Sequence, residues 1–182
     1  MKKSILVLTA LSMFTLAAIL HPTKVNAQDN SKTTMLAESK DAKSAFSKAD
    51  KEMENLFKNS YGYVIFPNIG KGALGVGGAG GNGTVYEKGI AVGKAKMVQV
   101  TVGLQAGGEA YREVIFFENK AAFDRFKENK LEFSGQVSAV AAKEGASANA
   151  KYRDGVLVFT QERGGLMLEA SVGGQKFSYT AF

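Results

Sequence analysis

A glycine-rich segment is the first part of the sequence whose residue spacing could support chemistry. Gly70-Lys71-Gly72-Ala73-Leu74-Gly75 matches the pattern G-x-G-x-x-G, and an apolar stretch precedes it. In dinucleotide-binding folds a helix begins directly after these glycines, so that its N-terminus meets the pyrophosphate. Here more glycines follow, and no acidic residue occurs near position 95. The segment therefore fits tight bends or close strand packing better, or a loop whose amides and Lys71 meet an anionic headgroup.

Two glutamates form the other candidate for reaction chemistry. Glu109 and Glu113 lie four residues apart, and a pair of carboxylates can support acid–base catalysis or bind a metal ion. A surface or salt-bridged glutamate is the favoured interpretation, because Arg112 is close in sequence. A carboxylate-dependent hydrolase is thus the least favoured alternative. We assign no catalytic residue, no metal ligand and no cofactor.

The N-terminus has the three parts of a secretory signal peptide. Lys2 and Lys3 give a positive start, and the stretch from Ser4 to Leu20 is mostly apolar. Val25-Asn26-Ala27 then fits the small-x-small rule for cleavage. We expect residues 1–27 to be removed as a signal peptide.

Cleavage would change both the chemistry and the charge of the chain. The sequence has no cysteine, and its one histidine, His21, would leave with the signal peptide. Cys–His catalysis, Ser–His–Asp catalysis and histidine-bound zinc are then excluded. Residues 1–27 contain three lysines and no acid, so the net charge falls from +6 to +3. This mild charge suits anionic lipid and does not predict nucleic-acid binding. We expect an exported protein, periplasmic or secreted, that is not lipidated because no lipobox cysteine is present.

Hydrophobic periodicity predicts the elements that must position these residues. Residues 28–33 are polar and predict a flexible leader before a single domain over 34–182. Thr34 to Asn59 is helical in pattern, as one long helix or two short ones. Asn119 is expected to cap a further short helix that runs to about Phe133. The predicted strands are Tyr61–Phe66, stopped by Pro67, then Gly83–Glu87 and Gly89–Gly93 as a hairpin, Lys96–Gln105, Tyr111–Phe117, Gln136–Ala142, Ala146–Tyr152, Val156–Glu162, Leu166–Val172 and Gln175–Ala181.

These elements predict an α+β fold. We expect a strongly curved antiparallel sheet or partial β-barrel, with an N-terminal helical region and one further helix. The clearest alternation occurs in Lys96–Gln105, where Val98 and Val100 share one face and Gln99 lies on the other.

The glycine-rich motifs resemble those of a known family. Val64-Ile65-Phe66-Pro67-Asn68-Ile69-Gly70-Lys71-Gly72 is similar to the opening motif of the SYLF-domain family, and Gly103-Leu104-Gln105-Ala106-Gly107 follows in the family's order. The resemblance covers about residues 36–182. From composition, Gln105 either bonds buried backbone groups or touches a ligand, and the structural role is favoured. The motif residues to which we assign a structural role are Phe66, Pro67, Gly70, Gly72, Gly103, Gln105 and Gly107.

The resemblance implies a non-catalytic module that binds anionic phospholipid or a membrane surface at the cell envelope. Some eukaryotic members bind actin, but an exported bacterial protein would not ordinarily meet actin, so actin is an unlikely partner. Basic residues near an anionic membrane contribute about 1 kcal/mol each. The candidate lipid contacts are Lys40, Lys43, Lys48, Lys51 and Lys71, for which plain solvated lysines are the alternative. A structural or protein-interaction protein of the envelope is the second hypothesis, and the oligomeric state stays open.

Overall fold

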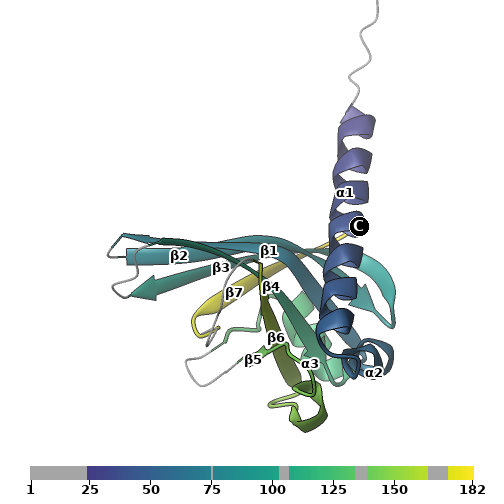
Figure 1. Cartoon of the computed structure of the whole chain (residues 1–182). Helices are drawn as coiled ribbons and strands as arrows, with labels where there is room; N and C mark the ends of the chain where they lie inside the picture. The colour runs from purple at the N-terminus through teal and green to yellow at the C-terminus, as the bar shows by residue number, and fades with distance from the viewer. Residues whose placement is uncertain (1–23, 75, 103–106, 134–138, 164–171) are drawn as a thin grey trace, which may run out of the picture.

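The chain is described from a computed structural model, which covers residues 24–74, 76–102, 107–133, 139–163 and 172–182 (Figure 1). The elements are α1 (Lys24–Ala49), α2 (Met53–Asn59), β1 (Gly62–Leu74), β2 (Val76–Glu87), β3 (Ile90–Val102), β4 (Gly107–Phe117), α3 (Lys120–Lys127), β5 (Val140–Ala141), the short 3₁₀ helix η1 (Ser147–Asn149), β6 (Val156–Glu162) and β7 (Gln175–Ala181). The N-terminal helical region is thus two helices, one of the two alternatives that the sequence left open.

Among the described residues, seven strands form one sheet in the order β5-β6-β4-β1-β2-β3-β7. Every neighbouring pair is antiparallel except β5 and β6, which are parallel. The sheet curls strongly. This is shown by a 2.9 Å hydrogen bond that Gln175 on β7 donates to Glu113 on β4, although β4 lies four strands away in the sheet order. The predicted α+β class with a curved sheet is confirmed.

The two faces of the sheet bury separate apolar clusters. The inner face holds Val64, Phe66 and Ile115, which pack with Phe123 and Phe126 of α3. The outer face is covered by α1 and α2 over part of its width. The buried residues there include Ala42, Phe46, Met53, Phe57, Tyr63, Ile65, Val114, Phe116, Leu157 and Phe159. Alternate residues of each strand therefore face different layers, as the period of a strand requires.

The first strand does not stop at Pro67, so that prediction is wrong. β1 continues to Leu74, and its pairing shifts register between Ile65 and Asn68 against β2. A similar shift occurs between Phe66 and Ile69 against β4. Such an irregularity tolerates a proline, because an unpaired position needs no backbone N–H donor.

Apart from residue 75, which lies outside the described residues, the glycine run from Gly70 to Gly83 forms strand rather than a long loop or a series of bends. It lies in β1 and β2, which pair in register from Asn68 with Asn82 to Leu74 with Val76. Some of these glycines are required by space. A methyl group at Gly81 would lie 2.7 Å from the Asn68 carbonyl oxygen, closer than real side chains approach.

Adjacent glycines on β2 should therefore respond differently to alanine. We expect Gly81→Ala to destabilise the fold by about 1–3 kcal/mol, because the added methyl group overpacks the β1 backbone. Gly80→Ala should change stability by less than about 0.5 kcal/mol, since its nearest neighbour would be the Met97 oxygen at 3.4 Å. Urea unfolding followed by circular dichroism measures both. Equal losses for the two variants would contradict this assignment.

Two further segments differ from expectation. Residues 28–33 lie within α1 and are helical, where a flexible leader was expected. The predicted strand Ala146–Tyr152 is wrong, because this segment contains η1 instead. Ser147 is held there by Asp50, whose Oδ2 accepts hydrogen bonds from the Ser147 amide at 2.8 Å and from its hydroxyl at 2.7 Å.

Candidate functional site

The five predicted lysines lie on several elements and not in one cluster. Lys40 and Lys48 are exposed on α1, and Lys51 is exposed in the turn before α2. Lys71 is partly exposed on β1, where it pairs in register with Ala79 of β2. Three of the five are therefore placed where an external partner can reach them directly.

Lys43 has internal contacts. Its Nζ donates a 3.2 Å hydrogen bond to the Tyr63 hydroxyl, and it lies 4.8 Å from the centre of the Phe57 ring. It also stands 5.2 Å from the centre of the Tyr63 ring. These contacts tie α1 to α2 and β1, so Lys43 contributes to the fold through cation–π and polar contacts.

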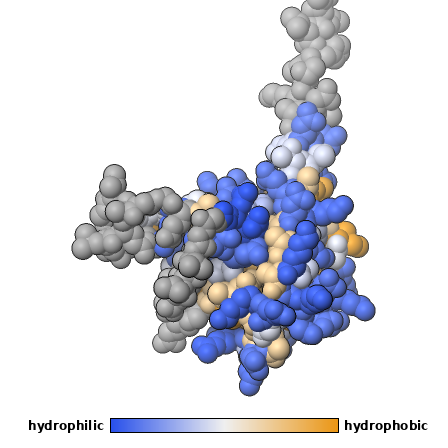
Figure 2. Space-filling model, viewed as in Figure 1, coloured by the Kyte–Doolittle hydropathy of each residue, from blue (hydrophilic) through white to orange (hydrophobic). Residues whose placement is uncertain are grey.

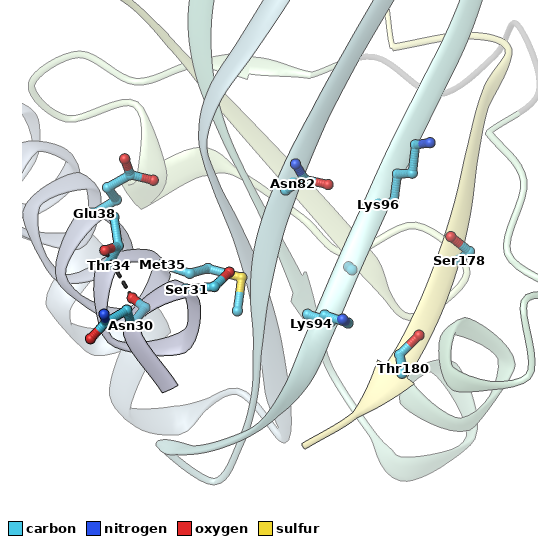
Figure 3. A pocket seen from close by; sticks show the side chains of 11 residues that line it. Asn30, Ser31, Thr34, Met35, Glu38, Asn82, Lys94, Lys96, Ser178 and Thr180 are labelled. Atoms are coloured by element: carbon cyan, nitrogen blue, oxygen red, sulfur yellow. Dashed lines mark hydrogen bonds between the residues drawn. The ribbon is translucent and has the colours of Figure 1, made fainter. Parts of the chain in front are cut away.

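A groove of about 710 Å³ separates the N-terminal half of α1 from the outer face of the sheet (Figure 3). Lys94 and Lys96 project into it from β3, and both are exposed. The other lining residues are Asn30, Ser31, Thr34, Met35 and Glu38 of α1, Asn82 of β2, Ala95 of β3, and Ser178 and Thr180 of β7. Two ammonium groups among hydroxyls and amides suit an anionic group. None of the five predicted lysines lines this groove.

Exposed aliphatic side chains follow these lysines along the same face of β3. Val98 is 46% exposed and Val100 is 71% exposed. Hydrophilic residues cover most of the described surface visible in Figure 2, which makes such exposure unusual. We call Lys94, Lys96, Val98 and Val100 the β3 outer face. It joins two cations to two apolar side chains on one strand.

Glycines keep the neighbouring surface flat. The register pairs Gly80 of β2 with Val98 of β3 and with Gly70 of β1, and Gly78 pairs with Val100. A methyl group at Gly70 would meet no atom within 4 Å, and at Gly78 it would meet only a carbonyl oxygen at 3.4 Å. Packing therefore does not demand glycine at these positions, unlike at Gly81. A planar partner can approach the backbone here.

Behind the two valines, the inner side of β3 changes from the buried apolar residues Ala95 and Met97 to a polar residue. Gln99 is buried on the inner side of β3, and its Nε2 donates a 2.8 Å hydrogen bond to the Gly173 carbonyl. Lys94 to Met97 have the usual arrangement, with lysines outward and apolar residues inward, but at Val98 to Val100 the valines point outward and Gln99 points inward. Two neighbouring exposed valines beside two lysines make this face a candidate docking surface.

Glu113 lies deeper inside the curled sheet. It is fully buried, and burial raises its pKa to about 8, although the hydrogen bond from Gln175 opposes this rise. Its second oxygen, Oε1, has no hydrogen-bond partner among the described residues. A buried carboxyl of this kind is protonated at neutral pH. The Glu109 side chain of the predicted pair lies outside the described residues.

The family motif residues divide between core and strand positions. Phe66 is fully buried, with its ring centre 6.0 Å from that of Phe177, and Pro67 is buried at the register shift. Gly70 and Gly72 lie in β1, and Gly107 is the first residue of β4. Gly103 and Gln105 fall outside the described residues.

Among the described residues, no group of three or more His, Cys, Asp or Glu side chains is arranged to hold a metal ion. No helix in that part of the chain is long and apolar enough to cross a membrane.

The β3 outer face was missed by the sequence analysis. The alternation from Lys94 to Val100 carried the signal, because residues two apart on a strand share a face. Periodicity did not reveal which face was exposed, since valines ordinarily turn inward.

Comparison with known proteins gives two matches. Residues 98–180 match the model of the Ysc84 family, described as a Las17-binding protein actin regulator. The chain is also 33% identical over 122 residues to beta cell expansion factor A of Aeromonas veronii, a match that covers 67% of this chain and 47% of that protein. The chain thus spans about half the length of this relative. These matches confirm the resemblance that the glycine-rich motifs indicated, and the chain belongs to the Ysc84, or SYLF-domain, family.

Proposed function

We propose that this protein is a non-catalytic module that binds anionic phospholipid at a membrane surface of the cell envelope. The β3 outer face is the contact surface. The observation that carries the proposal is the exposure of Val98 and Val100 on the same strand face as Lys94 and Lys96. The aliphatic side chains would enter the headgroup region while the ammonium groups meet lipid phosphates.

The two kinds of contact are of similar strength. Burying an exposed valine side chain contributes roughly 1.5–3 kcal/mol. A lysine beside an anionic membrane adds about 1 kcal/mol. Binding should therefore need anionic lipid and weaken as salt is added. The apolar contacts are not screened by salt, so part of the binding should remain at high salt.

The proposed location follows from the N-terminal segment. A signal peptide over residues 1–27 would deliver the chain to the periplasm or to the exterior without lipidation.

Charge reversal separates the β3 lysines from those predicted on α1. Lys94→Glu with Lys96→Glu should weaken binding of the purified full chain to vesicles with 30% phosphatidylglycerol by roughly thirtyfold, for about 2 kcal/mol lost. Lys40→Glu with Lys48→Glu should weaken it much less, because no exposed valines stand beside those lysines. Vesicle flotation at low salt gives the bound fraction. Equal losses in both double variants would show a diffuse electrostatic contact instead.

A protein partner is the second candidate function. The description of the matched family names a Las17-binding protein and actin regulation, and both concern protein contacts. If this chain acts through such a contact, an envelope protein should be captured without lipid, and binding to vesicles should not exceed that of an unrelated basic protein. Sedimentation with filamentous actin tests whether actin, the least favoured partner, binds the protein.

A further inference from the structure

A second groove, of about 520 Å³, is lined by residues of α3, β5 and β6 and of the segments next to them. We call it the β6 groove. Its wall includes Leu131 and Phe133, which follow α3. Phe133 is fixed by backbone hydrogen bonds to Gly174 at 2.7 Å and Gln175 at 3.2 Å, next to β7. In the part of the chain that the structure describes, β5 pairs with β6 only at Phe159 and Thr160.

The floor of the groove is apolar. Phe133 and Val158 are each 2% exposed, and both belong to the inner core cluster. The apolar lining residues are Leu131, Phe133, Ala139, Val140, Ala150, Val156, Leu157 and Val158. A water-sized group occupies about 30 Å³, so the β6 groove has room for more than a dozen methylene-sized groups.

The rim of the groove is basic. Four cationic side chains line it, against the two acids Glu132 and Asp154. The four are Arg125, Lys130, Lys151 and Arg153. Two of the charged lining residues form ion pairs with residues outside the groove. Lys130 pairs with Glu128 at 2.7 Å, and Glu132 pairs with Lys176 at 3.3 Å.

Lys151 and Arg153 are the cations best placed for a ligand. Both are exposed, and neither makes an ion pair within 4 Å in the described part of the chain. They alternate on the segment that leads into β6, so they stand at one end of the apolar floor. Arg125 donates instead to the Asp154 backbone carbonyl, which fixes the turn beside them.

We propose that the β6 groove binds one molecule of a single-chain anionic amphiphile, such as a free fatty acid. The acyl chain lies on the apolar floor, and the carboxylate meets Lys151 and Arg153. A nucleic acid would gain nothing from the aliphatic floor, and a neutral lipid would leave the cationic rim unused. This site is separate from the β3 outer face and takes a monomeric lipid rather than a membrane surface.

Decanoate below its micellar concentration is the probe, titrated by calorimetry into the purified full chain without vesicles. We expect decanoate to bind at least tenfold more tightly than acetate, which lacks the chain, and than 1-decanol, which lacks the charge. Lys151→Glu with Arg153→Glu should weaken decanoate binding at least tenfold. Both side chains are exposed, so this variant should keep the wild-type melting curve.

Lys94→Glu with Lys96→Glu is the matched control and should bind decanoate as the wild type does. If this control loses binding instead, decanoate occupies the β3 outer face and the proposal is wrong. The proposal would also be wrong if acetate or 1-decanol bound as tightly as decanoate. Only the cationic rim or only the apolar floor would then contribute to binding. Vesicle flotation of the Lys151→Glu, Arg153→Glu variant should be nearly unchanged, so failure of this site and failure of the proposed membrane contact give different results.

Discussion

Replacing Glu113 by glutamine is expected to make the protein more stable at pH 8 and to flatten the pH dependence of its stability. The wild-type carboxyl is fully buried, and burial raises its pKa from about 4.5 to about 8. Glutamine has nearly the same shape and never ionises. Its side-chain oxygen can still accept the hydrogen bond that Gln175 now donates to Glu113.

The sign of the wild-type effect follows from proton binding. Between pH 4.5 and 8 the folded state holds a proton on Glu113 that the unfolded state has lost. Stability must therefore fall as the pH rises through this window and level off above it. One pKa unit corresponds to about 1.4 kcal/mol, so the total loss is on the order of 3–5 kcal/mol. Burial also raises the pKa of Tyr111, so this phenol stays protonated throughout.

Urea unfolding at pH 5, 6.5 and 8 measures the effect in both proteins. Histidine titration should add little to the pH dependence of stability in this range, because the only histidine of the chain is His21 near the N-terminus. The wild type should lose stability across the series, and Glu113→Gln should stay nearly level. Parallel curves for the two proteins would mean that Glu113 does not hold its proton when folded.

Aspartate at Val98 and Val100 together should abolish binding to anionic vesicles. Each change removes a side chain worth roughly 1.5–3 kcal/mol on burial and sets a negative charge against the lipid phosphates. We expect a loss of roughly a hundredfold or more in vesicle affinity. Stability should change little, because Val98 and Val100 are among the exposed apolar residues of the described chain.

Ile90→Asp is the matched control. Ile90 begins the same strand and is 70% exposed, against 71% for Val100. It lies beside the hairpin turn at Lys88 and Gly89, at the opposite end of β3. This variant should float with vesicles as the wild type does. A comparable loss at Ile90 would mean that net charge, and not the valine contact, controls binding.

Local signals predicted much of the fold. β6 and β7 have the predicted bounds, Val156–Glu162 and Gln175–Ala181. Asn119 caps α3 as expected, with its side-chain oxygen accepting from the Ala122 amide at 3.0 Å. The hairpin at Lys88 also forms, with positive φ at Lys88 and Gly89. Each of these depends on neighbours in sequence, which a pattern can show.

Long-range contacts account for what the pattern missed. α3 ends at Lys127 rather than near Phe133, since Phe133 exchanges hydrogen bonds with the segment at β7. Ser147 turns because Asp50, 97 residues earlier, binds it. Predicted strand Leu166–Val172 falls outside the described residues apart from Val172. Of predicted strand Gln136–Ala142 the structure describes residues 139–142, and β5 occupies Val140–Ala141 there.

The candidate site also combines a local pattern that the sequence shows with a long-range effect that it does not show. Alternation placed Val98 and Val100 together, but their outward direction follows from the burial of Ala95, Met97 and Gln99 on the opposite face of β3. A sequence pattern fixes which side chains share a face. Tertiary packing decides whether that face meets the core or the solvent.

An environment-sensitive fluorophore on β3 tests the membrane contact most directly. The chain has no cysteine, so a probe such as NBD can be attached at one site, Val100→Cys or Ile90→Cys. On adding vesicles with 30% phosphatidylglycerol, the probe at Val100→Cys should shift to the blue and be quenched by nitroxide-labelled lipid. The probe at Ile90→Cys should show neither change. Equal responses at both positions, or none at Val100→Cys while the protein floats with vesicles, would contradict membrane binding through the β3 outer face.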